Sequence, residues 1–256
     1  MNNQTLNYGM DIRQRNRSLL LERFSQAELQ GCYGICEEAE ALLQGGSYRS
    51  TPEKSTEKGG NFALGRKQEA ILEEWAKAKG LWHNNSTKYF SDLYGAMYAQ
   101  GGESTVYLKN DGRNVVKEIE LAYYIEPHLA LDRVVLHNAY VGLEAPLTII
   151  GFGRNSEANF VIMVEQPFIQ GDTITLDEIF RFMIALGFTL YRHKTEYTNG
   201  EILLNDVHDE NVLKTPDGHY VIIDADFRLN TCNYGVGGTR ITGGSQLLEP
   251  LVKRNE

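Results

Sequence analysis

The sequence predicts an α+β fold, and three observations lead to this prediction. Apolar residues recur at helical spacing in the first third of the chain, up to about residue 82. From residue 97 the pattern changes to short runs of β-branched residues separated by glycine-containing turns. A strongly amphipathic segment then leads into a polar loop and an apolar hairpin. Separate helical and strand-rich stretches, without strict alternation, are typical of α+β proteins.

The first third of the chain predicts two helical segments joined by a linker. Residues 17–44 have helical apolar spacing, with an interruption near Gly31. Residues 45–61 are rich in glycine, serine, threonine and charge, which predicts a linker or mobile loop and a domain boundary. A second helix follows in GRKQEAILEEWAKAKGLW, residues 65–82, where Gly80 is the expected stop.

The middle of the chain predicts strands. Residues 97–121 form β-rich runs broken at Gly101-Gly102 and at Asp111-Gly112, and the second break is a type I′ hairpin signal. Residues 127–138 predict a short helix that has Pro127 in its first turn. Residues 145–168 contain two further β-rich runs around a polar turn.

The last part combines a helix with a hairpin. Residues 175–193 predict an amphipathic helix that begins with a capping box of Thr175 and Glu178. Apolar arms at 212–213 and 221–223 flank a Pro-Asp-Gly turn, which predicts a hairpin. Such a hairpin places Asn211 and Asp224 near the same end, because one residue ends each arm.

Composition limits the expected binding partners and the expected cellular location of the protein. The formal net charge is −9 and the pI is near 5.3, which argues against a general nucleic-acid-binding surface. We expect no membrane-spanning segment, because no run of about 18 apolar residues occurs. The first residues carry charges where a signal peptide needs an apolar core, so we expect a cytoplasmic protein.

Cysteine usage agrees with a reducing compartment. Cys32 and Cys36 form a lone C-x3-C without a matching second pair, and the third cysteine is Cys232. Free thiols on one helix face are favoured over a zinc site, which would need four ligands.

The polar residues around the last hairpin suggest a catalytic site. Unpaired buried carboxylates are costly, yet LLNDVHDENVLKTPDGHYVIIDADF, residues 203–227, places six beside apolar strands. Asn211 follows Asp206 by five residues, and Asp224 comes thirteen residues later. Upstream, Lys117 ends the β-rich run NVVK beyond a Gly-Gly turn. Enzymes that transfer a phosphoryl group from ATP with Mg²⁺ use this set of groups: a lysine on a strand, an aspartate in a loop, two metal ligands with oxygen atoms and a glycine-containing turn.

These motifs resemble those of the protein-kinase-like superfamily. DVHDENVL, from Asp206, occupies the place of the kinase catalytic loop H-R-D-x-x-x-x-N, and with His208 it also resembles the D-x-H-x-x-N loop of aminoglycoside and choline phosphotransferases. VIIDAD is similar to the strand and metal-binding aspartate of D-F-G. More narrowly, about residues 70–245 resemble the kinase-like domains of polyvalent proteins from phages and conjugative elements.

The resemblance implies a two-lobed kinase-like fold with a truncated C-terminal lobe and an added N-terminal helical segment. Residues 1–60 would be that segment with its mobile linker. Residues 61–256 would be a minimal kinase-like domain, with a small lobe at about 90–168 and a reduced large lobe at about 169–256.

The resemblance also implies roles for single residues. Lys117 would pair with the nucleotide phosphates, Asp206 would orient or deprotonate the acceptor hydroxyl, and Asn211 and Asp224 would bind Mg²⁺. The phosphate loop would consist of Gly101, Gly102, Glu103 and Ser104. The connector that contacts adenine would contain Met163, Glu165 and Phe168. The acid that holds the lysine would be Asp132 or, alternatively, Glu126.

The chain departs from the kinase pattern at several positions. Leu204 and Asn205 replace the histidine and arginine before the catalytic aspartate, so control through a phosphorylated activation loop is not expected. Ala225 and Asp226 replace the last two residues of D-F-G, and Asp226 is either a further metal ligand or a turn residue. The phosphate loop has two glycines instead of three, and no A-P-E-like segment follows Asp224.

Three functions remain open at this stage. The first is a Mg-ATP-dependent phosphotransferase acting on a hydroxyl of a protein or small molecule. The second is a non-catalytic nucleotide-binding or interaction module, a pseudokinase, on a mobile element. The third is nucleotidyl transfer with ATP in a reversed orientation. The sequence identifies neither the acceptor nor the oligomeric state.

Overall fold

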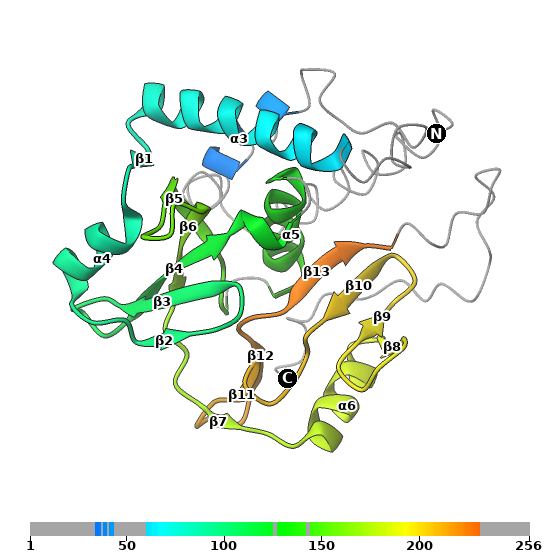
Figure 1. Ribbon diagram of the computed structural model, residues 1–256. Coiled ribbons are helices and arrows are strands. Elements are labelled where there is room, and N and C mark those ends of the chain that lie inside the picture. Colours follow the sequence, from blue (N-terminus) through cyan, green and yellow to red (C-terminus); the bar gives the residue numbers. More distant parts are fainter. Residues whose placement is uncertain are drawn as a thin grey trace. The chain divides into compact units, whose positions relative to one another are not determined.

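A computed structural model describes residues 34–36, 38–39, 41–43, 60–124, 127–141 and 144–230. These residues divide into two compact units. The sheet unit contains the described residues up to Val135, together with Leu147–Phe168. The hairpin unit contains Leu136–Pro146 and the described residues from Ile169 on. Figure 1 shows the elements of both units.

The sheet unit is built on six strands in the order β1-β5-β6-β4-β3-β2. All neighbours are antiparallel except β1 and β5, which are parallel. The strands are β1 (Trp82–His83), β2 (Ala99–Gln100), β3 (Ser104–Leu108), β4 (Asn114–Glu120), β5 (Thr148–Arg154) and β6 (Phe160–Pro167). The β-rich runs predicted between residues 97 and 168 are therefore confirmed.

Two glycines of β5 allow β1 to lie close beside it. A Cβ atom at Gly153 would lie 2.5 Å from the His83 carbonyl oxygen, and one at Gly151 would lie 2.9 Å from the Leu81 carbonyl oxygen. The Phe152 N–H donates to that Leu81 oxygen at 2.8 Å. The glycines thus permit a backbone approach that a side chain would block.

The helical elements that accompany this sheet after residue 59 are α3 (Gly60–Lys79), α4 (Ser86–Tyr94), η2 (Leu121–Tyr123) and α5 (Pro127–Val141), whose residues from Leu136 belong to the hairpin unit. The predicted helix at 65–82 is confirmed as α3, and Gly80 follows it with a φ of 72°. The predicted helix at 127–138 is confirmed as α5, with Pro127 as its first residue.

The two faces of the sheet differ. Opposed residues of antiparallel strands share a face, so Lys117 of β4 lies on the face of Val106 and Val164, its partners in β3 and β6. The neighbouring residue Glu118 lies on the other face, where α4 packs. A buried cluster fills that second face: Phe90, Tyr107, Val116, Val161 and Met163.

The hairpin unit contains two small sheets and α6 (Leu176–Ala185). One sheet has the order β13-β10-β9-β8 and the other β12-β11-β7. Their strands are β7 (Asp172–Thr173), β8 (Thr189–Leu190), β9 (Tyr197–Thr198), β10 (Ile202–Asn205), β11 (Val212–Lys214), β12 (Tyr220–Ile222) and β13 (Asp226–Leu229). The predicted hairpin is confirmed, with Leu213 opposite Val221 in β11 and β12.

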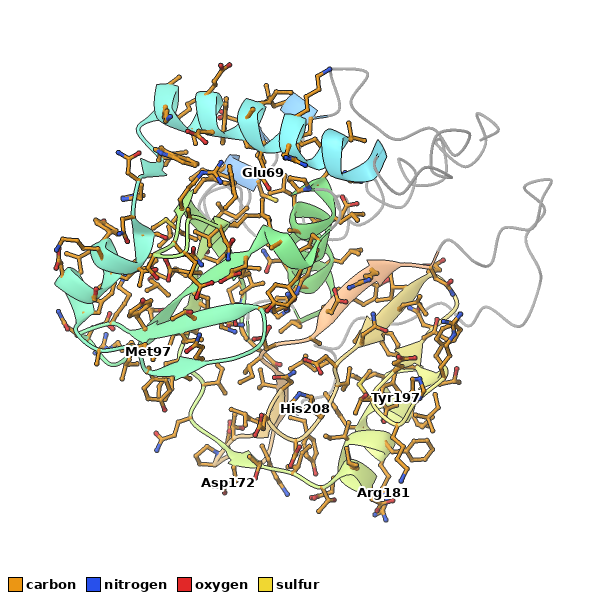
Figure 2. All side chains as sticks on the ribbon, in the orientation of Figure 1. Glu69, Met97, Asp172, Arg181, Tyr197 and His208 are labelled. Atoms are coloured by element: carbon orange, nitrogen blue, oxygen red, sulfur yellow. The ribbon has the colours of Figure 1, made fainter. Side chains whose placement is uncertain are left out.

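Helix α6 packs one face on the core of the hairpin unit. Its capping box is complete, because the Thr175 hydroxyl accepts from the Glu178 N–H and Glu178 Oε2 accepts from the Thr175 N–H. Ile179 and Met183 enter a core with Phe188 and Tyr197. Arg181, which Figure 2 labels on α6, is exposed and pairs with Asp177.

Two sequence predictions need correction. The predicted helix at 175–193 ends at Ala185, because Gly187 adopts a φ of 83° and the chain continues into β8. The turn at Asp111-Gly112 is not of type I′, since Gly112 has a φ of 65° but Asp111 has no positive φ. Five residues join β3 to β4, and Gly112 is the one among them with a positive φ. Hairpin loops of this length are most often built around a type I turn.

Much of the N-terminal prediction lies outside the described residues, including the linker at 45–59, Cys32 and most of the segment 17–44. Within that segment the residues 34–36, 38–39 and 41–43 are helical. Cys36 is a buried free thiol close to the Leu131 carbonyl oxygen, at 3.8 Å. In the part of the chain that the structure covers, no helix combines the length and apolar character needed to cross a membrane.

Candidate active site

The loop between β10 and β11 holds Asp206 in an unusual backbone conformation. Asp206 has a φ of 62°, and Ala158 is the only other non-glycine residue with positive φ in the described ranges. Left-handed backbone is uncommon outside glycine and persists where surrounding contacts enforce it. The Asp206 side chain is 68% exposed. The fold therefore presents this carboxylate to solvent from a fixed backbone.

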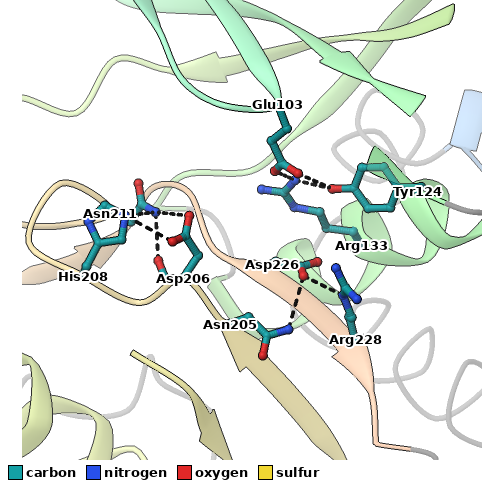
Figure 3. A network of polar contacts seen from close by, with 9 residues as sticks. All are labelled: Glu103, Tyr124, Arg133, Asn205, Asp206, His208, Asn211, Asp226 and Arg228. Carbon is teal, nitrogen blue, oxygen red and sulfur yellow. Dashed lines mark hydrogen bonds and ion pairs between the residues drawn. The ribbon is translucent and has the colours of Figure 1, made fainter. Parts of the chain in front are cut away.

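Asn211 stabilises that loop. Its Nδ2 donates to the Asp206 carbonyl oxygen at 2.8 Å and to Asp206 Oδ2 at 3.1 Å (Figure 3). No described residue donates to Asn211 Oδ1, which leaves this oxygen as an acceptor. The two residues of the D-x-x-x-x-N pattern are thus brought into direct contact.

His208 completes the loop. The Glu210 N–H donates to His208 Nδ1 at 3.2 Å, and His208 Nε2 lies 3.0 Å from Asn211 Nδ2. Nε2 lies 3.3 Å from Asp206 Oδ1. His208 therefore contacts both residues of the D-x-x-x-x-N pattern, Asp206 and Asn211.

The hairpin of β11 and β12 brings Asn211 close to Asp224. The Ile223 N–H donates to the Asn211 carbonyl oxygen at 2.9 Å, one position beyond the last strand pair. Asp224 follows Ile223 directly and is half-buried. Both residues that the sequence predicts as Mg²⁺ ligands therefore come from the same end of one hairpin.

Asp226 lies on a strand and is held by two neighbouring side chains. It lies on β13, opposite Asn205 of β10, so the turn interpretation of Asp226 is wrong. Its Oδ2 accepts from Asn205 Nδ2 at 3.2 Å and from Arg228 Nε at 2.5 Å (Figure 3). Its Oδ1 is buried and accepts no hydrogen bond from the described residues. The contact with Asn205 ties the residue before Asp206 to the neighbouring strand.

Lys117 lies in the sheet unit, at the centre of β4. The residue is 6% exposed and is flanked by Val106 of β3 and Val164 of β6. A lysine in the middle of a sheet among valines is unusual for a charged residue. The predicted partner Asp132 lies on α5 in the same unit, whereas Glu126 lies outside the described residues.

The predicted phosphate loop connects β2 and β3. Gly101 and Gly102 are exposed, and the Gly101 N–H donates to the Ser104 carbonyl oxygen at 2.8 Å. Glu103 does not point freely into solvent, because its carboxylate pairs with Arg133 of α5 and with the Tyr124 hydroxyl. Sequence reasoning did not predict this contact, because Arg133 is thirty residues away from Glu103 and surface arginines are common on helices.

The predicted connector residues occupy three different environments. Met163 packs in the buried cluster on the face of the sheet opposite Lys117. Glu165 is paired within β6, and its carboxylate accepts from Lys109 Nζ at 3.0 Å. Phe168 follows β6, its N–H donates to the Arg113 carbonyl oxygen at 2.7 Å, and its ring contacts Tyr98. Phe168 is the first residue beyond β6, and its N–H continues the backbone pairing between β6 and the segment before β4.

These features define the class of the protein: an α+β kinase-like fold with a lysine on a central strand and a D-x-H-x-x-N loop. The profile of a family described as serine/threonine/tyrosine kinase found in polyvalent proteins matches residues 65–231, and the chain belongs to this family. A comparison with curated proteins gave no match.

Proposed function

We propose that the protein is a Mg-ATP-dependent phosphotransferase that moves the γ-phosphoryl group of ATP to a hydroxyl group of a protein or small molecule. The observation that carries the proposal is the contact between Asn211 Nδ2 and Asp206. It fixes the catalytic aspartate and leaves the Asn211 Oδ1 atom as a metal ligand. Membership of the kinase family supports the same assignment.

Magnesium fits the residues that the hairpin provides. Mg²⁺ takes oxygen ligands and usually keeps water and substrate phosphates in its coordination shell. Asn211 Oδ1 and the Asp224 carboxylate supply two such oxygens. In the described ranges, no group of three or more His, Cys, Asp or Glu residues could hold a metal ion. We therefore expect magnesium to bind together with the nucleotide phosphates, where it neutralises their charge.

The remaining roles follow from position. The Asp206 carboxylate accepts or orients the proton of the acceptor hydroxyl while that oxygen attacks phosphorus, and ADP leaves. The Lys117 ammonium pairs with phosphate oxygens, Asp132 holds the lysine, and the exposed Gly101-Gly102 turn lies over the phosphates. Phe168 marks the start of the segment that contacts adenine.

Thermal unfolding with Mg²⁺ and ATP tests the first step. At 100 times its Kd, a bound ligand adds about 2.7 kcal/mol to the free energy of unfolding. Asp224→Asn should remove the magnesium dependence of this stabilisation. Asp206→Asn should retain nucleotide binding and lose turnover, and asparagine is the suitable replacement because it tolerates the left-handed backbone at this position.

Glu210→Gln is the matched control. Glu210 lies in the same loop, is exposed, and no contact of its carboxylate is seen. The substitution removes the same charge and should leave both binding and turnover unchanged. Absence of any magnesium-dependent stabilisation in the parent protein would refute the proposal. Binding without turnover in the parent would instead identify a nucleotide-binding pseudokinase, and mass spectrometry of the product distinguishes phosphoryl from nucleotidyl transfer.

A further inference from the structure

The phosphate loop contains an acidic residue at a place where negative charge is unfavourable. Glu103 lies between Gly102 and Ser104, and its carbonyl oxygen accepts from the Glu120 N–H at 2.9 Å. A carboxylate on a loop that receives a triphosphate repels the ligand unless its charge is compensated. The proposed function therefore raises the question of what compensates Glu103.

A buried arginine of the same unit compensates the charge of Glu103. Arg133 of α5 has a side chain that is only 5% exposed, and its Nη1 donates to Glu103 Oε1 (Figure 3). The same nitrogen donates to the Tyr124 hydroxyl, which in turn donates to Glu103 Oε2 at 3.3 Å. Both carboxylate oxygens of Glu103 are thus engaged by groups that belong to α5 and the segment before it.

This arrangement fixes the loop at two points. The Glu103 backbone is attached to the end of β4, and the Glu103 side chain is attached to α5. Ion pairs that are largely removed from water depend strongly on both partners, because the loss of one leaves the other uncompensated. The exposed Gly101 and Gly102 are then the part of the loop that remains available to a ligand.

We propose that Arg133 is a positioning residue for nucleotide binding: it neutralises Glu103 and holds the phosphate loop to α5, so that the loop accepts a polyphosphate. This inference rests on the proposed function. It predicts an asymmetry between the two partners. Without Arg133 the Glu103 charge faces the nucleotide, whereas without the Glu103 charge the repulsion is absent as well.

Binding of Mg-ATP, Mg-ADP and adenosine to purified variants tests this prediction by calorimetry. Arg133→Met should weaken Mg-ATP binding roughly tenfold, the size expected for one added repulsive charge at short range. The loss should be smaller for Mg-ADP and near zero for adenosine. Glu103→Gln should change Mg-ATP binding by less than about threefold, because it removes the repulsive charge.

The double variant Glu103→Gln/Arg133→Met decides between charge compensation and simple structural support. We expect it to bind Mg-ATP more tightly than Arg133→Met alone, because the uncompensated carboxylate is gone. Tyr124→Phe removes a hydrogen-bonding group without changing charge, and it should leave the dependence on phosphate number intact. If Arg133→Met does not fold, Arg133→Lys retains the charge without the planar fork and should keep binding within a few fold.

Two outcomes would overturn the inference. One is additive losses in the double variant, and the other is an equal loss for adenosine and Mg-ATP in Arg133→Met. Either result in a parent protein that binds Mg-ATP rejects the role of Arg133 alone. A parent protein that binds no Mg-ATP rejects the proposed function itself, and with it the inference.

Discussion

At the scale of single residues, several charged and polar groups are held in environments that their types do not predict. Glu118 of β4 is 2% exposed, and hydroxyl groups of Ser86, Thr87 and Tyr107 surround its carboxylate. Burial raises the pKa of Glu118 above its ordinary value, and this effect exceeds the lowering by the three hydroxyl donors. Burial, together with the neighbouring Glu118 carboxylate, raises the pKa of Tyr107 to about 12. Glu118 therefore attaches the start of α4 to the sheet, next to Lys117.

The raised pKa of Glu118 predicts a pH dependence of stability. The folded protein binds this proton more tightly than the unfolded chain, so the free energy of unfolding falls as pH rises from about 4.5 through the folded-state pKa. Each unit of increase in the pKa corresponds to about 1.4 kcal/mol. Glu118→Gln should remove this slope, which urea denaturation between pH 4.5 and 8 measures.

The parent protein provides the comparison for Glu118→Gln. The curve of stability against pH for Glu118→Gln should diverge from the parent curve as pH rises. Parallel curves for Glu118→Gln and the parent would show that the buried carboxylate does not titrate differently in the folded state.

At the scale of elements, the parallel contact of β1 with β5 depends on glycine. His83 is paired with Gly153, and a side chain at Gly153 would overlap the His83 carbonyl oxygen. Because that oxygen belongs to the backbone, it cannot turn away as a flexible side chain could. Trp82 of β1 in turn contacts Phe160 of β6, at 5.3 Å between ring centres. The position of β1 therefore depends on a residue without a side chain.

Gly153→Ala should lower the free energy of unfolding by about 2 kcal/mol, the middle of the range for overpacking. The matched control is Gly102→Ala, because an added Cβ at Gly102 meets no atom within 4 Å and the residue has no positive φ. The control should leave stability unchanged or raise it slightly. Urea denaturation followed by tryptophan fluorescence measures both, and equal stability of the two variants would contradict the role of Gly153.

At the scale of the whole molecule, local signals predicted the elements well. Some features depend only on residues that are neighbours in the chain, and the sequence predicts these. Examples are the capping box of α6, the turn at Gly218 and the proline that begins α5. The contact between Asn211 and Asp206 also spans only five residues. By contrast, the pairing of Glu103 with Arg133 spans thirty residues and depends on how α5 packs.

Tertiary packing also explains what the sequence did not reveal about the faces of the sheet. Lys117 and Glu118 are adjacent, and strand alternation places them on opposite faces. Their sequence does not show that both are buried, or that three hydroxyl groups surround Glu118. In the same way, aspartate tolerates left-handed backbone better than most residues, but the sequence does not show that Asp206 adopts it in the folded loop.

The proposed function makes a prediction for the two units together. Lys117 belongs to the sheet unit, whereas Asp206, Asn211 and Asp224 belong to the hairpin unit. The proposed function assigns a role in Mg-ATP binding to residues of each unit, so nucleotide binding should slow amide hydrogen exchange in each unit. We expect protection around residues 101–108 and around residues 211–223 in the parent protein, measured by mass spectrometry with and without Mg²⁺ and ATP. Asp224→Asn should reduce protection in both segments, because the phosphates lose their metal ion, and Glu210→Gln should reduce it in neither. Protection confined to one segment in the parent protein would show that the nucleotide engages a single unit, which contradicts the phosphotransferase assignment.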